Sequence, residues 1–406
     1  MKGGEAAGEV IIRRMKAAKL STPLLITRFA ELTDLVDHLT RQPVVAVDTE
    51  SNSLYAYREQ VCLIQFSTLR EDYLVDPLAI RDLSLLGPMF ADPKIEKVFH
   101  AAEYDLICLE RDFEFRFANL FDTMLAARIL GREELGLGAL LEQEFGVVLD
   151  KRNQRANWGQ RPLPADLLAY ARLDTHYLIQ LRQLLHDELV GKELWLLAHE
   201  DFRRMEDVRE SAGRGAGIEH RLNGSGAEEN EHDFWRIKGA HDLSPQKAAV
   251  LQELCEYRQG MAQALNRPLF KVINDRTLLV LAQEVPHNTA QLAQVEGLTP
   301  GQIQRHGEAL LEAIRRGLHA GPIFPPPNGR PDEAFINRLE ALRGWRKKAA
   351  ELMGVKSDVV LPRDLMLAIA REAPCSLREL NGLMQSVPWR MERFGGQIME
   401  ALGEEG

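Results

Sequence analysis

The sequence has few cysteines and no long apolar run. Its four cysteines are Cys62, Cys108, Cys255 and Cys375, and no two of them form a C-x-x-C pair. Scattered cysteines exclude a disulfide-rich secreted frame and favour a reduced, cytoplasmic protein. A membrane-spanning helix needs about 18 or more consecutive apolar residues, and charged residues interrupt every apolar stretch here. We therefore expect neither a membrane span nor a signal peptide.

An excess of basic residues is also missing. The 406 residues include 50 Lys and Arg against 60 Asp and Glu, a formal net charge of -10. Proteins that bind phosphate-rich partners usually show a basic surface, but cations bound to acidic side chains offset negative charge. The net charge therefore neither supports nor excludes a nucleic-acid substrate. A chain of this length, 45% hydrophobic, is expected to form two or three globular domains.

The first half of the chain predicts an α/β domain with a mixed five-stranded sheet. Residues 61–68 and 72–76 are close enough to pair as a hairpin. A helix is expected to open near Ala101, and helical spacing of apolar residues continues from Asp122 to about His199. The expected strands are residues 44–47, 61–68, 72–76, 96–100 and 117–123.

The second half contains an internal repeat, which predicts two copies of an all-α helical module. The segment that begins at Leu251 resembles the one that begins at Leu339, 88 residues later, and Tyr257 matches Trp345 at the same offset. Gly-rich and Pro-rich segments are expected to separate the domains. The expected divisions are an N-terminal extension (1–21), the α/β domain (22–206), a Gly-rich linker (207–231), a first helical module (232–320), a Pro-rich linker (321–331) and a second helical module (332–406).

Five polar side chains lie where the pattern predicts buried structure. Asp48 and Glu50 follow an apolar strand and project from one face of it, because side chains alternate along a strand. Asp105 lies early in the helix after the fourth strand. Asp174 lies on an apolar helix stripe, with Tyr170 one turn earlier on the same face. Each acid alone also fits a solvated strand end or helix face, but acids on apolar stripes are uncommon.

Together, the four acids fit one shared metal site. Two divalent cations need several hard oxygen ligands, and they can activate a water while stabilising the departing oxygen of a phosphodiester. Tyr170 is placed to hold that water in line. The four carboxylates and the phenol therefore predict hydrolysis of phosphodiester bonds.

The same residues resemble a known family. The segments "DTE" (48–50), "HAAEYDL" (100–106) and "YARLD" (170–174) resemble the three motifs of DEDD-superfamily exonucleases, and the Tyr four residues before the last Asp resembles the tyrosine branch. The segments 61–68 and 150–174 are similar to ribonuclease D, and the two helical modules resemble HRDC domains. The order nuclease, HRDC, HRDC is that of bacterial ribonuclease D.

This resemblance implies an RNase H-like fold and a 3′ to 5′ exoribonuclease that releases nucleoside monophosphates. It implies RNA substrates, namely tRNA precursors and other structured RNAs with 3′ extensions. It also implies two divalent metal ions, Mg²⁺ or Mn²⁺. Ser51 stands where many relatives carry Phe, and Asp166 where Gln is frequent. By motif position the metal ligands are Asp48, Glu50, Asp105 and Asp174, and these acids with Tyr170 form the catalytic set.

Four further side chains are candidates for substrate contacts, each with an alternative. His100 either contacts substrate near the scissile phosphate or packs at a strand end. Gln65 either reaches the terminal nucleotide or is a satisfied polar residue on a strand. Trp158 and Arg161 follow a basic run and suit a stacked base and an RNA backbone. An ordinary packing role is an equal alternative for Trp158.

Two other functions fit parts of the sequence. A 3′ to 5′ DNA exonuclease of the Werner or proofreading type uses the same chemistry, and none of these motifs reads the 2′-hydroxyl. A non-catalytic RNA-binding protein is expected to lack one of the four acids, yet all four are present. A helicase motor is excluded because no G-x-x-x-x-G-K-[ST] phosphate loop occurs. We expect a monomer, because no coiled-coil seam is evident.

Overall fold

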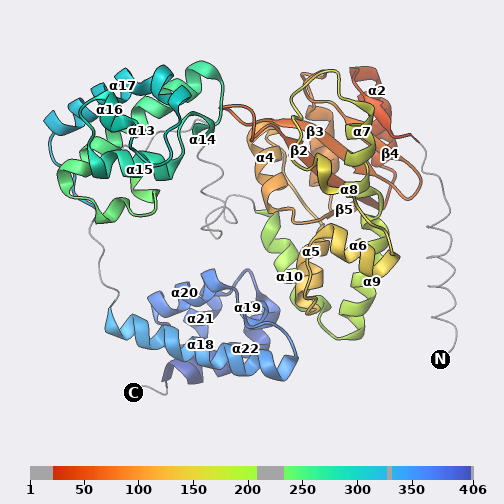
Figure 1. Cartoon of the computed structure of the whole chain (residues 1–406). Helices are drawn as coiled ribbons and strands as arrows, with labels where there is room; N and C mark the ends of the chain where they lie inside the picture. Colours follow the sequence, from red (N-terminus) through yellow and green to blue (C-terminus); the bar gives the residue numbers. More distant parts are fainter. Residues whose placement is uncertain (1–21, 208–232, 327–331, 404–406) are drawn as a thin grey trace. The chain divides into compact units, whose positions relative to one another are not determined.

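The computed structural model describes residues 22–207, 233–326 and 332–403 (Figure 1). The described residues divide into two compact units. Those of 1–51, 61–218 and 331–406 form the first unit, and those of 52–60 and 219–330 form the second. The expected N-terminal extension and nearly all of the Gly-rich linker lie outside the described residues.

A mixed six-stranded sheet forms the centre of the α/β domain. Its strands are β1 (Leu24–Ile26), β2 (Val44–Ser51), β3 (Val61–Ser67), β4 (Asp72–Val75), β5 (Glu96–Phe99) and β6 (Leu120–Asp122). The order is β1-β4-β3-β2-β5-β6, with β3 antiparallel to both of its neighbours and the other pairs parallel. The expected mixed sheet and hairpin are confirmed. The additional strand, β1, is a three-residue edge strand, too short for its sequence to show a period.

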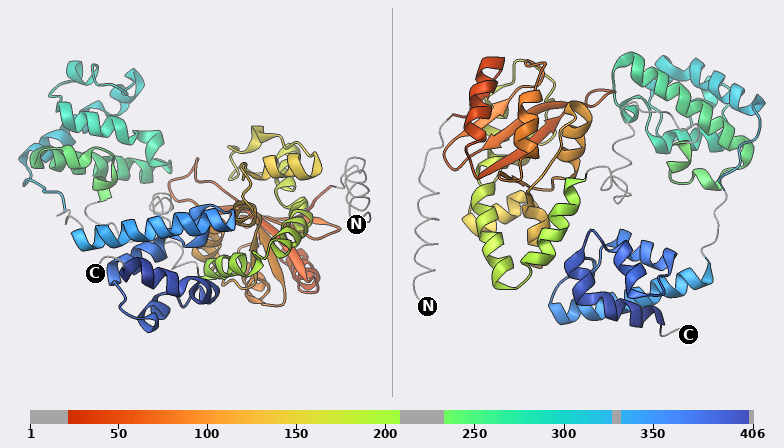
Figure 2. Two further views of the ribbon diagram at one scale, coloured as in Figure 1. Left: turned by 90° about the horizontal axis from the view of Figure 1, so that it is seen from below. Right: turned by 180° about the vertical axis from the view of Figure 1, so that it is seen from behind.

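Helices cover both faces of this sheet (Figure 2). On one face, Phe66 of β3 packs against Phe90 with ring centroids 6.0 Å apart. On the other face, Ala46, Val98 and Phe121 share one core cluster with the later helices of the domain. No helix in the described ranges combines the length and apolar character that crossing a membrane requires. The helices of this domain are α2 (Phe29–Leu39), α3 (Gly87–Ala91), α4 (Glu103–Phe113), α5 (Thr123–Ile129), α6 (Leu137–Phe145), α7 (Ala165–Ala171), α8 (Leu173–His176), α9 (Leu178–Gly191) and α10 (Trp195–Glu206).

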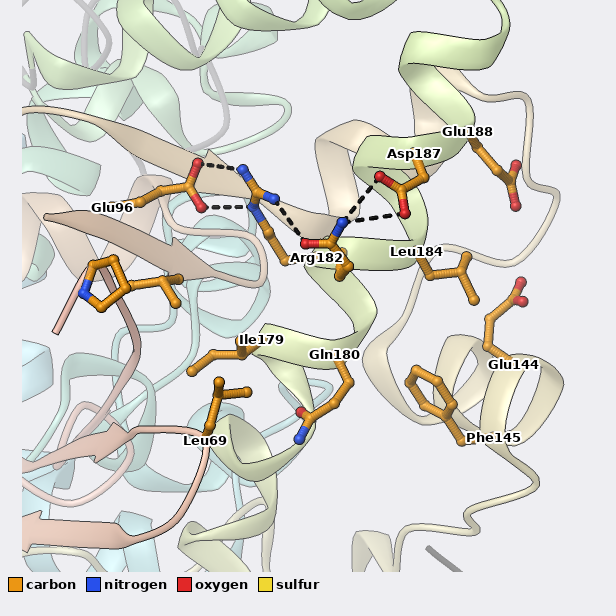
Figure 3. A pocket seen from close by; sticks show the side chains of 13 residues that line it. Leu69, Glu96, Glu144, Phe145, Ile179, Gln180, Arg182, Leu184, Asp187 and Glu188 are labelled. Carbon is orange, nitrogen blue, oxygen red and sulfur yellow. Dashed lines mark hydrogen bonds and ion pairs between the residues drawn. The ribbon is translucent and has the colours of Figure 1, made fainter. Parts of the chain in front are cut away.

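A pocket of about 1070 Å³ opens at the amino ends of β2 and β5 (Figure 3). Val44 of β2, Phe145 of α6 and Ile179 of α9 contribute to its apolar walls. At its edge, Arg182 of α9 donates two hydrogen bonds to Glu96 of β5, at 2.6 and 2.8 Å, which fasten the helix to the sheet. None of the four predicted acids lines this pocket.

The internal repeat forms two modules of similar helical order. The first contains α13 (Pro245–Leu265), α14 (Leu269–Val272), α15 (Asp275–Glu284), α16 (Thr289–Leu292) and α17 (Pro300–His319). The second contains α18 (Glu333–Met353), α19 (Ser357–Val360), α20 (Arg363–Glu372), α21 (Leu377–Leu383) and α22 (Pro388–Gly403). Each begins with a 21-residue helix and has its own apolar cluster. The predicted pair of all-α modules is confirmed.

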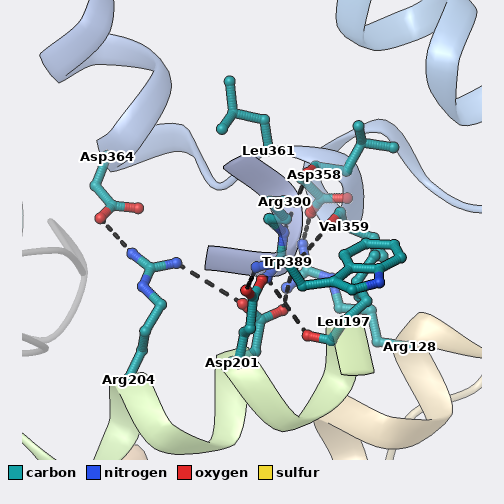
Figure 4. Close-up of polar contacts among 12 residues, drawn as sticks. Arg128, Leu197, Asp201, Arg204, Asp358, Val359, Leu361, Asp364, Trp389 and Arg390 are labelled. Carbon is teal, nitrogen blue, oxygen red and sulfur yellow. Dashed lines mark hydrogen bonds and ion pairs between the residues drawn. The ribbon is translucent and has the colours of Figure 1, made fainter. Parts of the chain in front are cut away.

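A buried arginine fastens the second helical module to α10 (Figure 4). Arg390 of α22 is fully buried, and its guanidinium donates to Glu200 Oε2 at 3.0 Å and Asp201 Oδ2 at 2.8 Å. It also donates to the carbonyl oxygens of Val359 at 2.9 Å and Val360 at 3.1 Å. Buried charges are tolerated when they are paired and hydrogen-bonded. These contacts therefore hold the module against the nuclease helices.

Replacing this arginine tests how much the contact stabilises the first unit. Arg390→Met is expected to lower the free energy of unfolding by about 3–5 kcal/mol, because it leaves buried carboxylates without their partner. Urea denaturation at fixed ionic strength measures this change. Arg378→Met, at an exposed position of α21, is the matched control and is expected to stay within about 0.5 kcal/mol. Equal effects of the two variants would contradict the assigned role of Arg390.

Candidate active site

Strand β2 carries Asp48 and Glu50 at its carboxyl end. The strand is fully buried at Val45, Ala46 and Val47, and the two acids beyond are half-buried. Strand β5 pairs with β2 only as far as Ala46, so the acids lie beyond the last pair with β5. On β3 the partners of Asp48 and Glu50 are two residues apart, and the alternation of the strand places both acids on one face.

Helix α4 brings Asp105 to this end of β2. The chain leaves β5 through Ala101, whose φ of 62° lies in the left-handed region that non-glycine residues rarely adopt. Helix α4 then begins at Glu103 and holds Asp105 in its first turn, where the helix dipole favours negative charge. Asp105 is 8% exposed, and its carboxylate accepts a hydrogen bond from the Thr49 hydroxyl of β2. This bond ties the third acid to the strand that carries the first two.

Tyr170 and Asp174 come from a helical segment that is interrupted at Arg172. Tyr170 lies in α7 and Asp174 in α8, and Arg172 between them keeps helical angles of φ −60° and ψ −28°. The amide of His176 reaches the Arg172 carbonyl at 3.0 Å, so the helical path continues despite the break. Helix α8 packs against β2 and β3. Asp174 therefore lies on a helix that packs against β2, the strand of Asp48 and Glu50, although the two segments are far apart in the sequence.

The carboxylates of Asp105 and Asp174 oppose the ionisation of Asp48 and Glu50. Burial raises the pKa of Asp48, and the charges of Asp105, Asp174 and Glu50 raise it further. Burial, then Asp174 and Asp105, likewise raise the pKa of Glu50. Burial is the main cause that raises the pKa of Asp105 and of Asp174 to about 7. Charge effects of this kind act over short distances, so the structure brings the four predicted acids into one site.

The same charges act on Tyr170. Burial raises the pKa of its phenol, and the carboxylates of Asp174, Glu50 and Asp48 raise it further. A phenol with a raised pKa is neutral at physiological pH and can donate a hydrogen bond. Tyr170 is therefore a neutral donor beside Asp174, Glu50 and Asp48.

The chemistry of these side chains fits divalent cations. In the described part of the chain, none of the four acids is paired with Lys or Arg. The same part holds no three His, Cys, Asp or Glu side chains grouped as a ready-made metal site. Carboxylates without counter-charges repel one another, and carboxylate oxygens are the ligands that Mg²⁺ and Mn²⁺ prefer. The four acids fit two such ions if the side chains draw together around them.

His100 directly follows strand β5, and Gln65 lies on β3. The His100 ring is held at the end of β5, where its Nδ1 lies 2.9 Å from the Thr123 hydroxyl, and burial lowers its pKa. Gln65 pairs with Asp48 across β3 and β2, so both side chains project from the same face. Gln65 is fully buried, and neither amide atom has a hydrogen-bond partner in the described residues. It is not the satisfied strand residue that the sequence also allowed.

Trp158 and Arg161 both have structural contacts within the domain. Trp158 is 2% exposed and packs near Tyr170, with ring centroids 6.2 Å apart. This favours the packing alternative, because a buried ring has no free face for a base. The Arg161 guanidinium donates two hydrogen bonds to Asp76, both at 2.7 Å, and a third to the Cys62 carbonyl. Its charge is therefore already neutralised within the domain.

One polar group beside the site was missed from the sequence. His176 lies two residues after Asp174, around the helix from it, and belongs to none of the predicted motifs. In the structure, its Nδ1 is 2.9 Å from both carboxylate oxygens of Asp72, a buried residue of β4. Asp72 had been predicted only as part of a strand. No local pattern signals this pair, because 104 residues separate its members.

Comparisons with known proteins cover most of the chain. Residues 24–190 match the 3′-5′ exonuclease family, and residues 247–314 and 336–402 each match the HRDC domain. Ribonuclease D of Pseudomonas paraeruginosa is 31% identical over 367 residues, which are 89% of this chain and 92% of that protein. Protein RRP6-like 1 of Arabidopsis thaliana is 32% identical over 314 residues, 74% of this chain and 47% of that protein.

The fold also matches a solved structure. Escherichia coli RNase D, described as an exoribonuclease involved in structured RNA processing, has a TM-score of 0.67 at 24% identity, with 95% of this chain and 99% of that chain covered. The predicted fold class is confirmed, apart from the additional strand β1. Because the similarity to ribonuclease D spans nearly the full length of both proteins, this chain belongs to the ribonuclease D family and is a 3′ to 5′ exoribonuclease.

Proposed function

We propose that Asp48, Glu50, Asp105 and Asp174 bind two divalent ions, Mg²⁺ or Mn²⁺, and form the catalytic site together with Tyr170. One observation carries this proposal. The four acids come from three separate segments, Asp105 and Asp174 raise the pKa of Asp48 and Glu50, and none of the four has a basic partner in the described residues. Exonucleases of the DEDD type generally use divalent metals, which supports the same assignment.

In this proposal the carboxylates bind the ions, and Tyr170 orients the attacking water. When bound, the ions activate a water and stabilise the departing oxygen of the phosphodiester. The four carboxylates supply the oxygen ligands. The neutral phenol of Tyr170 donates a hydrogen bond that orients the attacking water in line with the phosphorus–oxygen bond that breaks. The scissile bond is the last one at the 3′ end, so each cycle releases a nucleoside monophosphate.

Gln65 is the best-supported of the four substrate candidates. An unpaired buried amide costs about 1–3 kcal/mol, so its retention next to Asp48 calls for a partner that joins on binding. We infer that this partner is the terminal nucleotide. His100 is a second contact through its other ring nitrogen, because Nδ1 already faces Thr123. Trp158 and Arg161 act indirectly, by supporting Tyr170 and the segment before α7.

The substrates are RNAs with 3′ extensions, and we propose tRNA precursors among them. The relative from Escherichia coli is described as acting in structured RNA processing, which supports this choice. We propose that the enzyme works as a cytoplasmic monomer. Its scattered cysteines support that location.

Removing one acid tests the catalytic assignment. Asp174→Asn is expected to slow release of mononucleotides from a 3′-extended tRNA by roughly 1,000-fold, because a metal ligand supplies several kcal/mol to the transition state. Chromatography of the products with Mg²⁺, Mn²⁺ or EDTA measures the rate. Asp166→Asn, an exposed acid of α7, is the matched control and should cleave normally. The wild-type enzyme should cleave DNA of the same sequence more slowly than the RNA. Wild-type activity of the Asp174→Asn variant would refute the catalytic assignment.

Metal binding should also be visible without substrate. Mn²⁺ or Mg²⁺ is expected to raise the thermal midpoint by several degrees, because it relieves repulsion among the acids. Asp48→Asn should raise the midpoint of the metal-free protein and reduce the further rise with metal. Differential scanning fluorimetry measures both, with Ca²⁺-free buffer and EDTA as the reference. A wild-type midpoint that is the same with metal and with EDTA would contradict a metal site.

Replacing Gln65 should change stability and activity in opposite directions. Gln65→Leu is expected to raise the free energy of unfolding by about 1–3 kcal/mol, because it removes a buried unpaired amide. The same change should lower kcat/KM for RNA about tenfold, the loss of one substrate hydrogen bond. Gln302 is a matched control, since its amide is hydrogen-bonded to Thr299 and Val272. Gln302→Leu should destabilise the protein and leave kcat/KM unchanged; a Gln65→Leu variant with normal kcat/KM would exclude the contact.

A further inference from the structure

A buried polar network joins strands β3 and β4 to helix α8. The carboxylate of Asp72 accepts hydrogen bonds from the Ser67 hydroxyl at 2.7 Å and from His176 Nδ1 at 2.9 Å. It also forms an ion pair with Arg172, whose Nη2 is 3.1 Å away. The hydroxyls of Ser67 and Thr175 lie 2.7 Å apart. Ser67 and Thr175 are fully buried, and Asp72 and Arg172 are 5% exposed.

The helical members of this network surround Asp174 in the sequence. Arg172 precedes it by two residues, and Thr175 and His176 follow it directly. On the sheet side, Ser67 pairs with Ala46 of β2, two residues before Asp48. The network therefore connects the segment that carries Asp174 to β3, which pairs with the strand that carries Asp48 and Glu50, without using any of these acids.

The network opposes the electrostatic repulsion between the site carboxylates. Asp105 repels Asp174, and repulsion between like charges favours movement of α8 away from β2 when no cation is bound. Asp72 adds no repulsion of its own, because Arg172 and His176 face its carboxylate. Although burial acts to raise it, the pKa of Asp72 lies below its usual value because of the hydrogen bonds from His176 and Ser67. The charged carboxylate of Asp72 thus holds Arg172 and His176 of the helical segment and Ser67 of β3.

We propose that Asp72 is a positioning residue of the exonuclease site, which holds α8 so that the Asp174 carboxylate stays within reach of the metal ions. The inference rests on the proposed role of Asp174 as a metal ligand. Groups that orient a metal ligand typically change metal affinity or activity by about 10–100-fold when they are removed. Asp72 touches neither the ions nor the substrate, so its effect passes through α8.

The test compares two carboxylate–arginine contacts that fasten a helix to the same sheet. Asp72→Leu removes the contact beside Asp174, and Glu96→Gln weakens the contact between β5 and Arg182 of α9. Full-length protein is titrated with Mn²⁺ alone, and the concentration that gives half of the rise in thermal midpoint is determined. The kcat and KM for a 3′-extended RNA are then measured at fixed Mn²⁺.

Asp72→Leu is expected to raise the half-maximal Mn²⁺ concentration about 10–100-fold and to lower kcat with little change in KM. Higher Mn²⁺ should restore part of the lost kcat. Glu96→Gln should lower the midpoint of the metal-free protein but keep the Mn²⁺ dependence of the parent. If Asp72→Leu does not fold, Ser67→Ala is used, with a smaller shift in the same direction.

A folded Asp72→Leu or Ser67→Ala variant with the Mn²⁺ dependence and kcat of the parent would overturn the proposal. A lowered thermal midpoint without a shift in Mn²⁺ dependence would also overturn it, because the network would then be structural only. Asp174→Asn is measured in parallel. If that variant keeps the Mn²⁺ response of the parent, the site assignment itself fails, and this outcome is distinct from failure of the Asp72 inference.

Discussion

Repulsion among the four site carboxylates is the constraint on which the rest of the site depends. Two unit charges 4 Å apart repel by about 4 kcal/mol at an effective dielectric constant of 20, so acids on a flexible scaffold would separate. Strand β2 resists this because it is buried between two neighbouring strands and two helical layers. The Thr49 hydroxyl ties Asp105 to β2. Ser67 of the neighbouring strand β3 contacts Thr175 of α8. The sheet is therefore the rigid part against which the acids are held.

Charge pairing distinguishes the site from three other buried acids of the first unit. Asp76 is matched by Arg161, Asp72 by Arg172, and Glu200 by Arg390. In the described residues, the four site acids have no such partner. An arginine there would neutralise the carboxylates and compete with cations for their oxygens. The site carboxylates are thus unmatched at the place where we propose that cations supply the balancing charge.

The strand and helix elements of the site could be predicted from the sequence, because they depend on apolar patterns within short segments. The strand before Asp48 and the helix that holds Asp105 follow from apolar runs and their spacing. Strand β1 was missed because three residues show no period. The Asp72 network was missed because its members are brought together only by the packing of α8 on the sheet. Likewise, whether Trp158 is buried depends on the tertiary contacts of its ring, which composition near it does not reveal.

The site also lowers the stability of the fold that holds it, and the surrounding core offsets this. Gln65 has two unpaired amide atoms in a strand whose seven residues are all buried. Unpaired polar atoms and repelling acids at such a position are tolerated only where neighbouring apolar packing is extensive. The same strand exposes no part of itself to water, so bulk water cannot satisfy Gln65 as it would on a surface. On the proposed assignment, binding of substrate and cations removes both unfavourable contributions together, and the free energy so released favours the complex over the free enzyme.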